Sequence, residues 1–180
     1  MTERAVLTGT DIARALTRIA HEIVEQSRGA DDLVILGIPT RGAVLASRLS
    51  ELLAQISSEP IAHGPIAIGT LDVTMYRDDL ARQPTRAPSP TQIPSGGLDG
   101  RTVVLVDDVL YSGRTIRAAL DAISDLGRPR AVRLAVLVDR GHRELPIRAD
   151  FVGKNLPSAA SERINVRPTE IDGRDEVTIG

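Results

Sequence analysis

The sequence contains no cysteine, no tryptophan, one phenylalanine and two tyrosines. The absence of cysteine excludes a disulfide scaffold, a thiol nucleophile and a zinc site built on cysteine. The three histidines, His21, His63 and His142, lack the spacing of metal ligands. With so few aromatic rings, the chain has no platform on which the bases of single-stranded nucleic acid could stack.

The chain also lacks a long apolar run and a strong net charge. No stretch approaches the roughly 18 apolar residues of a membrane span, and the first residues do not read as a signal peptide. We therefore expect a cytoplasmic protein with no membrane partner. The formal net charge of −2 gives no chain-wide electrostatic footprint for nucleic acid. Residues 126–154 are locally basic, however, with seven basic residues against three acidic ones, and Lys154 is the only lysine.

Hydrophobic periodicity predicts helices that alternate with short apolar strands. A length of 180 residues with 42% hydrophobic residues suits one domain, 1–180. Helices are predicted at 11–27 (capped by Thr10 or Asp11), 43–56 and 115–126. Strands are predicted at 33–36, 66–73, 103–106 and 132–138, and shorter strand-like pieces at 151–152, 164–166 and 177–179. The alternation predicts an α/β fold with a parallel sheet covered on both faces. Ligands bind such sheets at the carboxyl ends of the strands, here after Leu36, Val106 and Val138.

The most informative segment is 103–115, in which an apolar strand is followed by two acids and a Ser-Gly-Arg-Thr turn. The turn, Ser112 to Thr115, offers backbone N–H groups and two hydroxyls at a helix N-terminus, which suits an anion. Asp107 and Asp108 repel a phosphate, but they can accept hydrogen bonds from vicinal sugar hydroxyls. Together these groups describe a seat for a 5-phosphoribose. The acids taken alone are also compatible with simple capping or loop residues.

This segment resembles the phosphoribosyl pyrophosphate (PRPP) signature of type I phosphoribosyltransferases. Four further runs, 17–22, 37–42, 71–80 and 134–155, look like one family: the bifunctional pyrimidine operon regulator and uracil phosphoribosyltransferase, PyrR. The resemblance extends from about residue 5 to 179 and is most diagnostic in 134–155. It implies the type I phosphoribosyltransferase fold, with a central, mostly parallel sheet flanked by helices. It further implies a flexible lid loop at about 74–100 and a small hood from about 139–180 plus the N-terminal residues. The proline-rich lid tip, Phe151 and Ser112 depart from the expected pattern without threatening it.

The resemblance implies the reaction of uracil and PRPP to UMP and pyrophosphate, with Mg²⁺ carried by PRPP and no direct metal ligand in the protein. Asp107, Asp108, Arg77 and Arg41 would be the catalytic residues, and backbone groups of Val138, Asp139 and Arg140 would bind uracil. The residues implied to bind PRPP and nucleotide are Thr40, Arg41, Arg77, Asp107, Asp108, Val109, Leu110, Tyr111, Ser112, Gly113, Arg114 and Thr115. Two alternatives stay open: a plain turn at Thr40–Arg41, and a solvated acid pair at Asp78 and Asp79.

The resemblance also implies regulation through binding of a pyr operon mRNA stem-loop when UMP or UTP is abundant, by a homodimer or higher homo-oligomer. The RNA-binding residues would be Thr17, Arg18, His21, Arg143, Arg148 and Lys154. Thr17, Arg18 and His21 share a helix face, because spacings of three and four superpose. The alternative is a solvated helix face with salt-bridged arginines. His142 is an additional candidate for the nucleotide site, and His63 reads as a surface residue.

Two other functions are compatible with parts of the sequence. The first is an RNA-binding regulator that uses the seat only to sense UMP; intact Arg41, Arg77 and both acids argue against it, because a sensor needs no pyrophosphate site. The second is a phosphoribosyltransferase for another base, such as a purine; the runs 71–80 and 139–148 argue against it.

Overall fold

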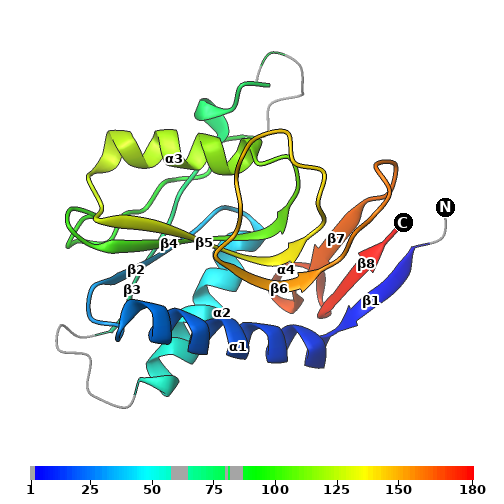
Figure 1. Ribbon diagram of the computed structural model, residues 1–180, viewed down its shortest axis with the longest axis horizontal. Coiled ribbons are helices and arrows are strands. Elements are labelled where there is room, and N and C mark those ends of the chain that lie inside the picture. Colours follow the sequence, from blue (N-terminus) through cyan, green and yellow to red (C-terminus); the bar gives the residue numbers. More distant parts are fainter. Residues whose placement is uncertain (1–2, 58–64, 80, 82–86) are drawn as a thin grey trace.

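The computed structural model describes residues 3–57, 65–79, 81 and 87–180. Its larger sheet has five strands in the order β3-β2-β4-β5-β6, all parallel (Figure 1). The strands are β2 (Leu33–Gly37), β3 (Ala67–Thr70), β4 (Thr102–Leu110), β5 (Ala131–Asp139) and β6 (Phe151–Asn155). The predicted parallel α/β sheet is therefore confirmed. His63 lies outside the described residues.

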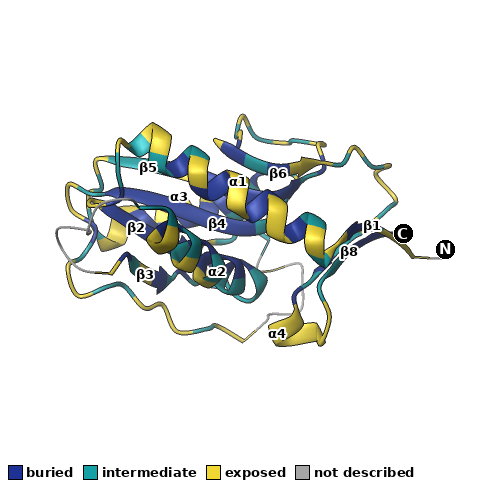
Figure 2. Cartoon of the chain, turned by 90° about the horizontal axis from the view of Figure 1, so that it is seen from below, coloured by how far each residue is buried: buried dark blue, intermediate teal, exposed yellow. Residues whose placement is uncertain are grey.

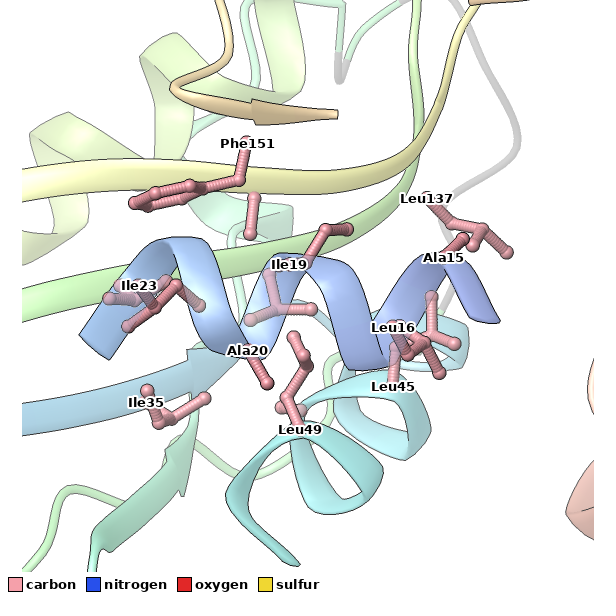
Figure 3. Packing of buried hydrophobic residues seen from close by; sticks show 14 of the residues in the cluster. Ala15, Leu16, Ile19, Ala20, Ile23, Ile35, Leu45, Leu49, Leu137 and Phe151 are labelled. Atoms are coloured by element: carbon pink, nitrogen blue, oxygen red, sulfur yellow. The ribbon is translucent and has the colours of Figure 1, made fainter. Parts of the chain in front are cut away.

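Helices cover both faces of this sheet, and the alternation of side chains along β4 explains why. Val104 and Val106 face the cluster formed by α1 (Gly9–Ser27) and α2 (Arg41–Ile56), whereas Val103 and Leu105 face α3 (Arg114–Leu126). Figure 3 shows the first cluster, in which α1 places a buried apolar stripe against α2 and the sheet. A strand buried on both faces needs a continuous apolar run, as 103–106 provides.

A second, three-stranded antiparallel sheet, which we call the hood, lies at one end of the molecule (Figure 1). It is built from β1 (Arg4–Thr8), β7 (Ile164–Arg167) and β8 (Glu176–Ile179), in the order β1-β8-β7. Both chain ends therefore meet in one sheet, and the short helix α4 (Thr169–Asp172) connects β7 to β8. Strand β6, although it lies within 139–180, belongs to the main sheet, because it pairs in parallel with β5.

Several boundaries differ from the sequence-based prediction, and three of these differences have a clear physical reason. Helix α1 is capped by Thr8, not by Thr10 or Asp11: the Thr8 hydroxyl accepts from the Asp11 N–H at 3.3 Å, and the Asp11 carboxylate accepts from the Thr8 N–H at 2.9 Å. Strand β3 ends at Thr70, so residues 71–73 are not part of it. Strand β4 continues through both acids to Leu110, because β5 runs beside it as far as Asp139.

Candidate active site

The carboxyl ends of β2, β4 and β5 meet at one edge of the sheet, as the sequence predicts. The Ile38 N–H after β2 donates to the Val106 carbonyl at 2.9 Å, and the Arg140 N–H after β5 donates to the Leu110 carbonyl at 3.1 Å. Helix α2 starts so close to β4 that a Cβ on Gly42 would lie 2.5 Å from the Val106 oxygen. Glycine at this position therefore lets Thr40 and Arg41 approach the two acids.

Asp107 and Asp108 lie near the end of β4, shortly before the Ser-Gly-Arg-Thr turn. Asp107 Oδ1 accepts from the Asp108 N–H at 2.9 Å, and Asp108 Oδ1 accepts from the Val109 N–H at 2.8 Å. Asp107 is 8% exposed. Burial, and then the neighbouring Asp108 charge, raise the pKa of Asp107 well above its ordinary value. Asp107 therefore takes up a proton more readily than an ordinary carboxyl, and its oxygens can accept hydrogen bonds from sugar hydroxyls.

The segment Tyr111 to Gly113 turns the chain from β4 into α3. Gly113 has a φ of +93°, and the Arg114 N–H donates to Ser112 Oγ at 3.3 Å. The left-handed glycine aims the first N–H groups of a helix that runs from Arg114 to Leu126 into the space before it. With the hydroxyls of Ser112 and Thr115, this end of α3 is suited to a phosphate, and it lies beside the acids as predicted.

The described part of the lid loop docks on this helix. After the 3₁₀ helix Thr74–Tyr76, Arg77 Nη1 donates to Thr115 Oγ1 at 3.0 Å, which places the arginine beside the phosphate turn. Arg77 also holds Asp79 through two hydrogen bonds of 2.8 and 2.7 Å, which raise the pKa of Arg77 and lower that of Asp79. Asp78 pairs with Arg114 at 2.5 Å. Asp78 is exposed and Asp79 is partly exposed, so the pair is both accessible to solvent and bonded to arginines.

The far end of the lid loop returns to the sheet. Thr70 and Gln92 exchange two backbone hydrogen bonds of 3.0 and 2.9 Å. The Asp72 N–H donates to Thr91 Oγ1 at 2.9 Å. Residues 80 and 82–86 of the expected lid lie outside the described residues.

Arg41 is the first residue of α2 and faces the hood. Its Nη2 lies 3.2 Å from both carboxylate oxygens of Asp172, after β7. Its Nε is buried and has no hydrogen-bond partner among the residues that the structure describes. A cavity of about 600 Å³ joins Arg41 and Asp108 to the hood residues Arg163, Asn165 and Arg167. The sequence analysis missed these hood residues, because nothing in the sequence shows which strand faces the acids.

The residues predicted to bind uracil lie at the end of β5, next to the phosphate turn. Val138 is buried, and the Asp139 carbonyl accepts from the Leu156 N–H at 2.9 Å. The Arg140 guanidinium stacks over the Tyr111 ring at 4.3 Å and donates to Ser158 Oγ at 2.9 Å. His142 meets the same ring edge-on, with centroids 6.1 Å apart, so it too lies beside the candidate nucleotide site.

Most of the residues predicted to bind RNA gather on α1 and β6. Thr17, Arg18 and His21 are exposed on α1 and line a hollow of about 510 Å³. Figure 2 shows the alternation of exposed and buried residues along this helix. Arg18 donates to the Val152 and Gly153 carbonyls at 3.1 and 2.6 Å, so the exposed Lys154 of β6 belongs to the same surface.

The other two predicted RNA contacts lie in the loop between β5 and β6. Arg148 is exposed, whereas Arg143 is bonded within its own loop. In the basic segment, Arg130 and Arg133 also have acidic partners, Asp32 and Asp150, at 3.7 and 3.5 Å. All six RNA-binding assignments stay predictions.

The described residues contain neither a metal-binding cluster nor a membrane-spanning helix. Residues 3–57, 65–79, 81 and 87–180 contain no group of three or more His, Asp or Glu side chains arranged to hold a metal ion. No helix among them is long and apolar enough to cross a membrane.

The fold and the phosphoribose seat at the end of β4 define a type I phosphoribosyltransferase. The family model described as phosphoribosyl transferase domain matches residues 4–169. A hypoxanthine phosphoribosyltransferase of Trypanosoma cruzi superposes with a TM-score of 0.71 at 15% identity, covering 98% of this chain and 95% of that one. One from Staphylococcus aureus gives 0.64 at 20% identity, covering 87% and 79%. At such identities these structures show the fold alone.

Relatives with high sequence identity to this chain share the name bifunctional protein PyrR. The bifunctional protein PyrR of Leifsonia xyli is 72% identical over 179 residues, which cover 99% of this chain and 97% of that protein. Its namesake in Streptomyces coelicolor is 65% identical over 98% of this chain and 89% of that protein. That of Mycobacterium tuberculosis is 52% identical over 98% and 92%. The chain belongs to the PyrR family of bifunctional proteins.

Proposed function

We propose that the protein is a uracil phosphoribosyltransferase that also regulates pyrimidine biosynthetic genes by uridine-nucleotide-dependent binding to pyr mRNA. The single observation that carries this proposal is the 72% identity to a bifunctional protein PyrR over nearly the whole of both chains. The site supports it, because the acids, the phosphate turn and two arginines gather at one sheet edge. The protein is thus an enzyme and a regulator in one domain.

The reaction replaces the bond between the ribose C1 and pyrophosphate by a bond to a uracil nitrogen. We assign the ribose hydroxyls to Asp107 and Asp108, and the 5-phosphate to the segment Tyr111 to Thr115. Arg41 and Arg77 are assigned to the pyrophosphate, whose growing negative charge they would neutralise. No nucleophile is needed, since the protein contributes mainly position and electrostatic stabilisation.

We assign uracil to the backbone at Val138, Asp139 and Arg140. These residues end the strand next to β4, and the Arg140 N–H donates to the Leu110 carbonyl just before the phosphate turn, so a base there would lie beside that turn. The Arg140 side chain, stacked on Tyr111, supports this assignment by tying the two loops together.

Mg²⁺ enters the proposal as part of the Mg–PRPP substrate. Asp108 borders the cavity that the proposal gives to PRPP, so the Mg²⁺ carried by the pyrophosphate would lie near a carboxylate without needing a direct ligand from the protein. When bound, the ion would supply charge neutralisation of the pyrophosphate.

For the regulatory function, we assign RNA contacts to the surface formed by Thr17, Arg18, His21 and Lys154, together with Arg148 and Arg143. This surface is polar and basic, and it fits readout of a folded hairpin by shape and phosphate contact. We further propose that the protein is located in the cytoplasm. We also propose that it forms a homodimer or a higher homo-oligomer.

The test is UMP formation from uracil and PRPP with Mg²⁺, measured beside orotate, hypoxanthine and adenine. We expect turnover with uracil alone. Turnover with a purine base would contradict the base assignment. Binding of UMP without turnover of any base would contradict the enzyme assignment and favour a sensor.

A further inference from the structure

We infer that Arg143 is a positioning residue that fixes the distance between the phosphate turn and the base end of the nucleotide site. The inference rests on the proposed function, because it concerns the binding of UMP at that site. It differs from the RNA contact that the family resemblance implies for this residue.

The Arg143 guanidinium connects three parts of the site. Its Nη2 is bonded to the Asp139 carboxylate at the end of β5. Its Nη1 donates to the Tyr111 carbonyl at 2.8 Å, at the start of the phosphate turn. Its Nε donates to the Ile147 carbonyl at 2.8 Å. A planar guanidinium can hold three acceptors in fixed directions, which a lysine ammonium cannot do.

The loop that carries Arg143 packs directly on the phosphate turn. The N–H groups of Glu144 and Leu145 both donate to the Ser112 carbonyl, at 3.0 and 3.1 Å. Ile147 lies against Gly113, where an added Cβ would be 3.3 Å from the Ile147 Cβ. The bonds from Arg143 therefore lock a loop that already touches the turn to the strand end at Asp139.

These bonds give Arg143 a role inside the protein, in addition to the RNA contact proposed above. The Arg143 side chain is 23% exposed, and each of its three nitrogens donates to an oxygen of the protein. Arg148, on the same loop, is exposed and has no such network among the described residues.

The physical consequence depends on which ligands span both ends of the site. UMP touches the phosphate turn and the base end at once, whereas PRPP lacks a base and uracil lacks a phosphate. Loss of a preorganised spacing weakens a spanning ligand most, because binding must then order the two loops. Arg143 should therefore act on UMP affinity and on the uracil KM more than on the PRPP KM.

The experiment measures UMP binding by calorimetry and both KM values for Arg143→Ala, Arg143→Lys and the control Arg133→Ala. Arg133 lies on β5, the strand that leads into the loop of Arg143, and has an acidic partner, Asp150, at 3.5 Å. For Arg143→Ala we expect about tenfold weaker UMP binding, a similar rise in the uracil KM and less than a threefold rise in the PRPP KM. Arg143→Lys should lie between this variant and wild type, and Arg133→Ala within twofold of wild type.

UMP affinity within twofold of wild type in Arg143→Ala would overturn the inference. Equal rises in both KM values and equal losses in the control would overturn it as well, because they would indicate general destabilisation. If Arg143→Ala does not fold, the inference is tested by the UMP affinity, the uracil KM and the PRPP KM of Arg143→Lys. Wild-type UMP formation tests the proposed function separately, so the two failures are distinguishable.

Discussion

At the residue scale, the fold buries the carboxyl group of Asp107, and burial disfavours its ionised form. Asp107 is buried, and this burial raises its pKa well above the ordinary range. A raised folded-state pKa means that stability is full below the unfolded value of about 3.9 and is lost as pH rises through the folded value. We therefore expect Asp107→Asn to unfold at a higher temperature than wild type at pH 7.5, with a difference that shrinks towards pH 4. Thermal unfolding of both proteins across this range checks it; an equal or lower melting temperature at pH 7.5 contradicts it.

We expect Asp107 and Asp108 to bind the ribose hydroxyls of PRPP. Replacing both acids, in Asp107→Asn with Asp108→Asn, removes two carboxyl groups that bind hydroxyls. A hydrogen bond to a charged group contributes about 1.5–3 kcal/mol, and one to a neutral group about 0.5–1.5 kcal/mol. We expect kcat/KM for UMP formation to fall by at least about a hundredfold while the protein remains folded. A steady-state assay with a circular-dichroism control measures this, and normal rates would remove the ribose assignment.

Local motifs could be predicted at this scale, but contacts between loops could not. The acids and the turn from Ser112 to Thr115 are contiguous in sequence, so their chemistry is visible before any fold is known. The stacking of Arg140 on Tyr111 depends on how the loop after β5 folds back. The network around Arg143 depends on the same loop, which is why the sequence could suggest only an RNA contact there.

At the scale of elements, the close packing of α2 on β4 positions Arg41. An added Cβ at Gly42 would meet the Val106 oxygen at 2.5 Å and the Asp107 Cα at 3.2 Å, both of them backbone atoms. Gly42→Ala should thus destabilise the protein by about 1–3 kcal/mol, as overpacking does, and raise the PRPP KM by displacing Arg41. Gly96→Ala is the matched control, since its Cβ would meet only the end of the Arg101 side chain. Urea unfolding and PRPP titration measure both; equal stability of the two variants would contradict the prediction.

The surface shared by α1 and β6 makes a separate prediction about RNA. Lys154 is exposed beside the helix that carries Arg18, so we expect it to contact a phosphate. Lys154→Gln should weaken RNA binding at saturating UMP and lower the salt slope by about one phosphate contact. Lys154→Arg should keep the slope. Binding titrations at several salt concentrations would show the assignment to be wrong if the Gln variant matched wild type.

The boundaries of an element could be predicted where the apolar residues of the segment itself set them. They could not be predicted where pairing with a distant strand sets them. The run 103–106 predicts a strand, but its extension through the acids comes from pairing with β5 as far as Asp139. Strand β1 is five residues long and forms only because β8, at the other end of the chain, pairs with it. No periodicity within Arg4–Thr8 signals that partner.

At the scale of the whole molecule, arginine side chains of α2 form ion pairs with the segment that connects the hood strands β7 and β8. Arg48 of α2 donates to Glu170 and Asp175, and Arg41 donates to Asp172. Within the hood, Arg167 pairs with Glu3 and Glu176. The acid-rich segment around α4 thus has its countercharges on α2, where the cavity that holds Asp108 begins. The placement of the hood therefore depends on ion pairs of α2, one of which involves Arg41, a residue that also lines this cavity.

This dependence gives a pH-sensitive prediction for Arg48. The Arg48 guanidinium lowers the pKa of Glu170 and of Asp175, and a lowered folded-state pKa adds stability above the unfolded value that is lost as pH falls. Arg48→Met should cost about 1 kcal/mol at pH 7, because Glu170 is half exposed and screened, and less at pH 2–3, because this stability is lost as the pH falls through the lowered folded-state pKa values of both carboxyls. Urea unfolding of wild type and variant at both pH values measures this, with Arg174→Met as an exposed control. A constant difference between wild type and Arg48→Met across pH would mean that Arg48 stabilises the hood through packing of its carbon chain. A difference that vanishes in acid means that charge holds the hood over the cavity, and the PRPP KM of Arg48→Met should then rise together with the loss of stability.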